Sequence, residues 1–153
     1  MSELNKIIPI PASWATQFKN LEDSRATQEA ALININSFPR YIISLIVIGF
    51  LPGLFEEVAF RAGLQNILTR WLKAPAFAII LTAIIFSLVH ISYYGFLVRF
   101  ALGVILGFVF YTSGNIWLSV LFHFLYNGLQ VTALYVYTLS GSKNQRDIEE
   151  NFH

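Results

Sequence analysis

Residues 100–142 read FALGVILGFVFYTSGNIWLSVLFHFLYNGLQVTALYVYTLSGS and contain no Asp, Glu, Lys or Arg. A helix needs about 20 predominantly apolar residues to cross a bilayer, so this stretch is long enough for two spans. The turn-forming sequence TSGN at residues 112–115 separates them. Gly103 and Gly107 form a GxxxG pair, which allows a neighbouring helix to approach closely. The stretch therefore predicts membrane helices that pack against one another.

The rest of the composition agrees with a membrane location. Of the 153 residues, 56% are hydrophobic and 12% are charged, whereas soluble domains carry roughly 25% charged residues. Two more apolar segments, residues 41–55 and 74–92, precede the charge-free stretch. The predicted fold class is an all-α, polytopic membrane helix bundle with about four spanning helices. Pro52 interrupts the first segment, which predicts two helices there because proline removes a helical hydrogen bond.

The two ends of the chain are more polar than its middle. In residues 1–37, apolar side chains recur at helical spacing, namely Ile10, Trp14, Phe18 and Leu21. This pattern predicts an amphipathic helix at the membrane interface, and a solvated arm that packs on the other helices is the alternative. Residues 141–153 are rich in charge and predict a solvated tail. Residues 38–140 form the membrane-embedded core between these ends.

Charge and cysteine content exclude several functions. A formal net charge of +1 offers no basic field for nucleic acid. The absence of Cys excludes disulfides and thiolate metal sites. Most Lys and Arg residues flank the apolar segments on one side, with Arg70 and Lys73 on the other, so both termini are predicted to be cytoplasmic. We expect an integral protein of the plasma, or inner, membrane.

Several ionisable residues interrupt the apolar segments. Each costs about 2.5 to 3.5 kcal/mol to insert into a membrane, so its presence needs a reason. Glu57 and Arg61 are four residues apart and can pair on one helix face, and such a pair could serve only to fix helix packing. Glu56 points about 100° away around the helix and has no partner within its own turn. An unpaired carboxylate in a membrane segment indicates a functional site.

Two imidazoles and a carboxamide accompany that carboxylate. His90 and His123 lie in separate apolar segments, and Asn127 stands one helical turn beyond His123. A carboxylate with a nearby His can activate water, and a His with an Asn can stabilise an oxyanion, as amide hydrolysis requires. Glu56, His90 and His123 could instead ligate zinc and leave a position open for water. These residues leave both mechanisms open, whereas a serine or cysteine nucleophile is disfavoured because the chain lacks Cys and a G-x-S-x-G elbow.

Three short motifs occur in order on successive apolar segments: EEVAFR at residues 56–61, FSLVH at 86–90 and HFLYN at 123–127. They resemble the EExxxR, FxxxH and HxxxN motifs of the CAAX prenyl protease and bacteriocin-processing family, also called the Abi family. The resemblance implies an all-α membrane bundle whose motif residues face one interior cavity. It also implies an intramembrane endopeptidase of the Ras-converting, glutamate type, with no cofactor expected and zinc as the alternative.

The resemblance further implies roles for four of the motif residues and the kind of partner. Glu56 would activate water with the help of His90, and His123 and Asn127 would form the oxyanion site. The expected partners are membrane lipid and a peptide or protein substrate, which is lipidated for some members. No nucleic acid is expected.

The paired residues Glu57 and Arg61 would support the helix and orient Glu56. One departure from the family pattern is Ala62, which stands before Gly63 where many members have Gly directly after the motif Arg. Relatives usually carry further spanning helices before the first motif, so the chain is expected to be the catalytic half of a longer protein or a short member. A non-catalytic membrane module that binds a peptide, as an immunity protein would, and a proton pathway are the alternatives.

Overall fold

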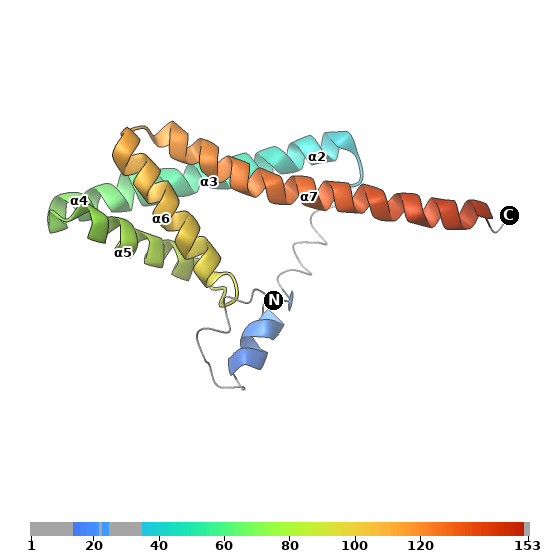
Figure 1. Cartoon of the computed structure of the whole chain (residues 1–153), viewed down its shortest axis with the longest axis horizontal. Helices are drawn as coiled ribbons and strands as arrows, with labels where there is room; N and C mark the ends of the chain where they lie inside the picture. The colour runs from blue at the N-terminus through green and yellow to red at the C-terminus, as the bar shows by residue number, and fades with distance from the viewer. Residues whose placement is uncertain (1–13, 22, 25–34, 152–153) are drawn as a thin grey trace.

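The computed structural model describes residues 14–21, 23, 24 and 35–151, with side chains described up to Gly141. Within these ranges the chain forms helices and turns and no strand, so the predicted all-α class is confirmed. Figure 1 shows a long α7 running beside the first part of the bundle, with α5 and α6 grouped at one end. After the helical residues 14–21, the elements are α2 (Phe38–Ser44), η2 (Leu45–Phe50), α3 (Leu51–Glu57), η3 (Val58–Gln65), α4 (Asn66–Leu72), α5 (Pro75–Val89), α6 (Phe96–Ser113) and α7 (Ile116–Asn151).

The elements α2 to α4 form one continuous helix from Phe38 to Leu72, and the predicted division at Pro52 is wrong. The π-helical turn η2 ends two residues before Pro52, and the N–H of Leu51 reaches back five residues to the carbonyl of Ile46. Such a turn shifts the register of the backbone hydrogen bonds, so the helix can pass a residue that lacks a donor. The acidic motif therefore lies on the same helix as the first apolar segment.

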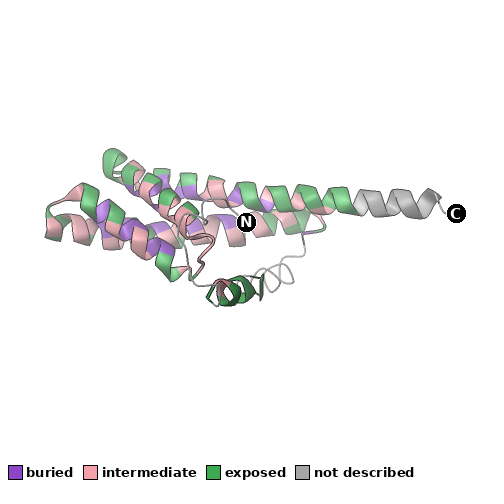
Figure 2. Ribbon diagram, turned by 60° about the horizontal axis from the view of Figure 1, so that its bottom comes forward, coloured by how far each residue is buried: buried purple, intermediate pink, exposed green. Residues whose placement is uncertain are grey.

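Two helices are long and apolar enough to cross a membrane among the described residues, Phe38–Leu72 and Phe96–Ser113. The helix α5 is apolar but has only 15 residues. Large apolar side chains such as Val47 and Ile105 are exposed, and exposed residues cover the outer faces of the bundle in Figure 2. A helix that is apolar on its outer face as well as its inner face suits a lipid environment. The structure thus supports two of the four predicted spans.

The last helix is longer than the apolar pattern indicated. The membrane core was predicted to end at residue 140, whereas α7 continues to Asn151. No proline follows residue 140, and Gly141 alone weakens a helix without stopping it. The prediction of a solvated tail concerns mainly the side chains after Gly141, which lie outside the described part.

The N-terminal segment is described only in part. Residues 14–21 are helical, as predicted, while Ile10 lies outside the described residues. The ring of Phe18 stacks on that of Tyr93 at a centroid distance of 5.5 Å, and the side chains of Trp14 and Leu21 are exposed. One face of this helix therefore contacts the loop that follows α5. Its placement at a membrane surface stays a prediction.

Small residues bring α5 and α6 into close contact. A Cβ atom added to Gly103 would lie 3.0 Å from the Cβ of Ala83. One added to Gly107 would lie 3.0 Å from Cγ2 of Ile79. The close approach predicted from the GxxxG pair is thus confirmed.

Aromatic and polar contacts hold α7 along the first long helix. The rings of Tyr41 and Tyr135 stack with centroids 4.6 Å apart, and the hydroxyls of Tyr41 and Thr132 share a hydrogen bond of 2.9 Å. Closer to the middle, Gly49 leaves room for the ring of Phe124, which would lie 3.2 Å from an added Cβ. These contacts fix the register of α7, so that the HFLYN motif lies opposite the two glutamates of α3.

Candidate active site

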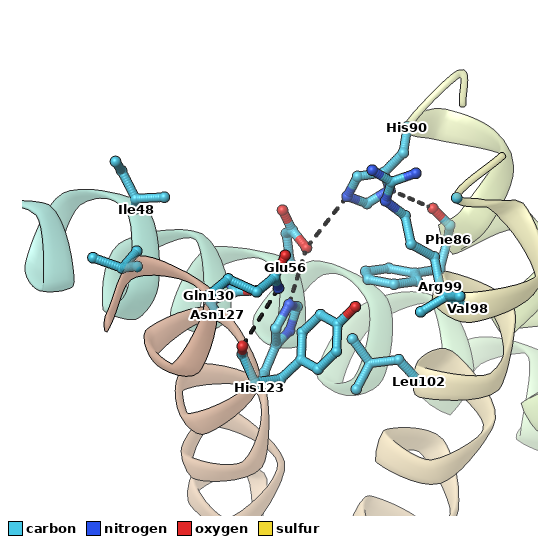
Figure 3. A pocket seen from close by; sticks show the side chains of 13 residues that line it. Ile48, Glu56, Phe86, His90, Val98, Arg99, Leu102, His123, Asn127 and Gln130 are labelled. Atoms are coloured by element: carbon cyan, nitrogen blue, oxygen red, sulfur yellow. Dashed lines mark hydrogen bonds and ion pairs between the residues drawn. The ribbon is translucent and has the colours of Figure 1, made fainter. Parts of the chain in front are cut away.

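Glu56 and Glu57 are the last two residues of α3, and their side chains point to different sides of the helix. The side chain of Glu57 is 0% exposed, whereas that of Glu56 is 29% exposed. Successive residues of a helix are rotated by about 100°, so adjacent carboxylates cannot share one environment. In Figure 3 the Glu56 carboxylate stands at the centre of a cavity.

Glu57 holds two side chains at once. Its Oε2 lies 3.1 Å from Nε of Arg61. The two groups form an ion pair but are not aligned for a hydrogen bond. The pairing predicted from their spacing is thus confirmed. Its Oε1 lies 2.9 Å from Nδ1 of His123, on a helix 66 residues further along the chain. A carboxylate only accepts hydrogen bonds, so Nδ1 of His123 is the donor. The buried carboxylate thereby fixes the orientation of an imidazole at the cavity.

Arg61 and Gln65 tie the same helix to α6. Nη2 of Arg61 donates to the carbonyl oxygen of Gly103 at 3.2 Å, and Nε2 of Gln65 donates to that of Gly107 at 2.9 Å. The two donor residues are four residues apart in the sequence, and so are the two acceptor residues. The acceptors are glycines, which lack the side chain that would block the close approach of the donors. The guanidinium of Arg61 also lies 4.8 Å from the ring centroid of Phe86, which adds a cation–π contact. Arg61 is buried, so these partners offset part of its desolvation.

Both histidines turn the same nitrogen towards Glu56. Nε2 of His123 lies 3.6 Å from Oε2 of Glu56, and Nε2 of His90 lies 3.8 Å from it. Nδ1 of His90 donates to the carbonyl oxygen of Phe86 at 2.7 Å, because a carbonyl can only accept. The separations from Glu56 exceed a direct hydrogen bond of about 2.7 to 3.2 Å, so neither imidazole holds the Glu56 carboxylate closely.

A cavity of about 540 Å³ surrounds Glu56. Side chains from four helical segments line it, and the polar ones include Glu56, His90, Arg99, His123, Tyr126 and Asn127. The cavity thus brings together four of the six residues singled out from the motifs. The other two, Glu57 and Arg61, are buried and lie behind it.

Three residues that contribute to the site or to its packing were not predicted from the sequence. Gln65 lies four residues after Arg61, so the same spacing that paired Glu57 with Arg61 could have placed it on the buried face. Phe86 was recognised only as part of its motif, yet its ring contacts both His90 and His123, with centroids 4.9 and 5.9 Å away. Arg99 was used only to predict the topology, although a cation near the start of an apolar helix itself indicates a candidate functional site.

The zinc alternative finds no support in the geometry. Among the described residues, no group of three or more His, Cys, Asp or Glu side chains is arranged to hold a metal ion. Glu56, His90 and His123 face one another but are not arranged as the ligands of a metal ion.

Comparison with known proteins identifies the family. A family model described as Type II CAAX prenyl endopeptidase Rce1-like matches residues 38–129, which is more than half of the chain and includes all three motifs. No curated protein and no solved structure matched the chain significantly. Members of such a family are peptidases that work in the membrane, in agreement with the two candidate spans. The chain therefore belongs to the Rce1-like family of type II CAAX prenyl endopeptidases.

Proposed function

We propose that the protein hydrolyses a peptide bond within the membrane by means of a water molecule activated by Glu56. The observation that carries the proposal is the placement of Oε2 of Glu56, 3.6 and 3.8 Å from two imidazole nitrogens inside one cavity. A carboxylate that faces two imidazoles without a close hydrogen bond to either can take a proton from water and pass it to a neighbour. Its partial exposure leaves it accessible to a substrate.

In the proposed reaction, Glu56 removes a proton from water while the oxygen attacks the carbonyl carbon of the substrate. His90 assists, because the hydrogen bond from its Nδ1 to Phe86 leaves Nε2 directed at Glu56. The proton then passes to the leaving amine as the C–N bond breaks. Asn127 donates to the oxyanion from the cavity wall.

His123 is the second proposed oxyanion donor, and its setting determines the form it must take. Its Nδ1–H is engaged with Glu57, and a neutral imidazole has only one N–H. Donation from Nε2 therefore requires the imidazolium, whose positive charge Glu57 offsets. Glu57 and Arg61 act as positioning residues in this scheme, since neither touches the cavity.

The proposed setting is residues 38–140 as the catalytic core with four passes, both termini cytoplasmic, in the plasma or inner membrane. The two candidate spans and the family support a membrane location. α5 would be the shortest pass, about 22 Å at 1.5 Å per residue, and local thinning of the bilayer accommodates a short helix. The substrate class is a peptide or protein near the membrane, with or without a lipid group, and no metal is required.

A cleavage assay on an unbiased peptide library tests the proposal. Purified protein in liposomes is compared with Glu56→Gln, which keeps the shape of the side chain and removes the base. Products that form with the original protein and not with the variant support the proposal. Equal cleavage by both proteins would rule out Glu56 as the base, provided that both unfold at the same temperature in detergent.

A further inference from the structure

Arg99 is a cation on the wall of the cavity that the proposed chemistry does not use. It lies one turn into α6 and is partly exposed, and it lines the same cavity as Glu56. An arginine inside an apolar helix is costly and is retained only for a reason. Unlike Arg61, it forms no ion pair with any carboxylate of the described chain.

The guanidinium of Arg99 also lacks a hydrogen-bond partner where one is needed. Its Nη1 is shielded from solvent and makes no hydrogen bond within the described residues. A shielded donor without a partner is unfavourable, and the cost is larger for a charged group. This donor lies against Gly95, whereas the residue as a whole lines the free cavity, where a bound anion would offset its charge.

The backbone is shaped to hold this guanidinium. A Cβ added to Gly95 would collide with Nη1 of Arg99 and lie 2.8 Å from its Cζ. The φ of Gly95 is −89°, which any residue adopts, so glycine is required here for space and not for conformation. Gly95 thus leaves the room that the Arg99 head occupies.

Figure 3 shows Arg99 on the His90 side of Glu56, while Asn127 lies on the other side. This separation distinguishes Arg99 from the proposed oxyanion donor, because the oxyanion forms next to Asn127. Arg99 is the one Lys or Arg among the described residues that line the cavity. A single planar guanidinium matches one carboxylate by two parallel hydrogen bonds.

We infer that Arg99 is a specificity-determining residue that binds a carboxylate of the peptide substrate and so selects the bond that Glu56 cleaves. The inference rests on the proposed function, since it requires a peptide in this cavity. The carboxylate comes from the chain terminus or from an Asp or Glu side chain. Both sources present the same group to the guanidinium.

The test uses one cleaved peptide in three forms: with a free C-terminal carboxylate, with a C-terminal amide, and as the amide with a Glu near its end. For the original protein, we expect kcat/KM to be about 10- to 100-fold higher for one of the carboxylate forms than for the plain amide, through KM, as a charge-assisted hydrogen bond would give. Whichever form is preferred identifies the source. In Arg99→Gln this preference falls to about one, and Arg99→Lys keeps part of it.

Two further variants control for folding. Gly95→Ala keeps the charge of Arg99 but displaces its head, so it should lower the preference as well. Arg70→Gln removes an exposed arginine that does not line the cavity, so its preference should match that of the original protein. If Arg99→Gln fails to fold, Gly95→Ala decides.

Three results would overturn the inference: no preference for either carboxylate form, a preference that persists in Arg99→Gln and Gly95→Ala, or an equal loss of kcat on all three peptides. Equilibrium binding of the three peptides is measured alongside cleavage. A carboxylate preference in binding that depends on Arg99, without any cleavage, would uphold the inference while the proposed function fails. Cleavage that requires Glu56 but shows no carboxylate preference would uphold the proposed function and overturn the inference about Arg99.

Discussion

The two faces of α3 carry the same chemical group into opposite environments. On the packed face, Glu57 is fully buried and holds Arg61 and His123 at 3.1 and 2.9 Å. On the cavity face, Glu56 is partly exposed and its nearest ionisable partners are at 3.6 and 3.8 Å. A carboxylate held by two close partners is suited to position other groups, and one with loosely placed partners can exchange a proton with water. Adjacent residues of one motif are thus placed for different roles.

The largest effect is expected from the cavity face. Glu56→Gln should lower kcat by about 10²- to 10⁴-fold, the range for loss of a general base, and leave Tm in detergent unchanged because no close partner is lost. Turnover measured with a cleaved peptide, together with thermal unfolding, checks both parts. Glu57→Gln is the matched variant, and it should lower Tm as well as kcat. Equal effects of the two variants on Tm would contradict the distinction between the faces.

The next effect concerns stability on the packed face. Arg61→Ala leaves the buried carboxylate of Glu57 without its cation, which costs roughly 3 to 5 kcal/mol when one partner of a buried pair is removed. The yield of folded protein and its Tm in detergent should both fall. Arg70→Ala, at an exposed position, serves as the control. An unchanged Tm for Arg61→Ala would show that Glu57 has another source of compensation.

A third variant tests the oxyanion side of the cavity. Removing an oxyanion donor typically costs about 10²- to 10³-fold in kcat, so Asn127→Ala should lower kcat to that extent with little change in KM. Asn127→Asp should be worse, because it places a negative charge beside the oxyanion. Steady-state kinetics on the same peptide distinguish the outcomes. A raised KM at constant kcat would assign Asn127 to ground-state binding instead.

A smaller effect is expected beside the packed face, where α6 meets α5. Gly103→Ala adds a methyl group 3.0 Å from Cβ and 3.1 Å from Cα of Ala83, and overpacking of this kind costs about 1 to 3 kcal/mol. Tm should fall accordingly. Gly141→Ala is the matched control, since nothing lies within 4 Å of an added Cβ there. If both variants have the same Tm, the two helices can move apart without loss.

The smallest expected effect is that of metal removal. If Glu56 is a base and not a ligand, strong chelators should leave kcat unchanged, and elemental analysis of the purified protein should find no stoichiometric zinc. One zinc per chain, with activity that is lost on chelation and restored by zinc, would make Glu56, His90 and His123 ligands. The contrast between the two glutamates would then be one between a metal ligand and a positioning residue.

Features that depend on neighbours along one helix could be predicted from the amino-acid sequence alone. Apolar segments of sufficient length predicted an all-α membrane fold, and the spacing of Glu57 and Arg61 predicted their ion pair, because side chains four residues apart meet on one face. The same rotation predicted that Glu56 points elsewhere. The GxxxG pair predicted a close helix contact, although not its partner. The three motifs predicted the family that the family model identifies.

Which separate helices meet, and in what register, follows from the tertiary packing and could not be predicted from the sequence. The contact between Glu57 and His123 spans 66 residues, and that between Gln65 and Gly107 spans 42. Hydropathy and helical spacing carry no information on such pairs, because helix register is set by side-chain packing over the whole bundle. For the same reason Arg99 counted in the sequence only as a flanking charge. Packing of α6 against α5 is what places its guanidinium in the cavity with Glu56.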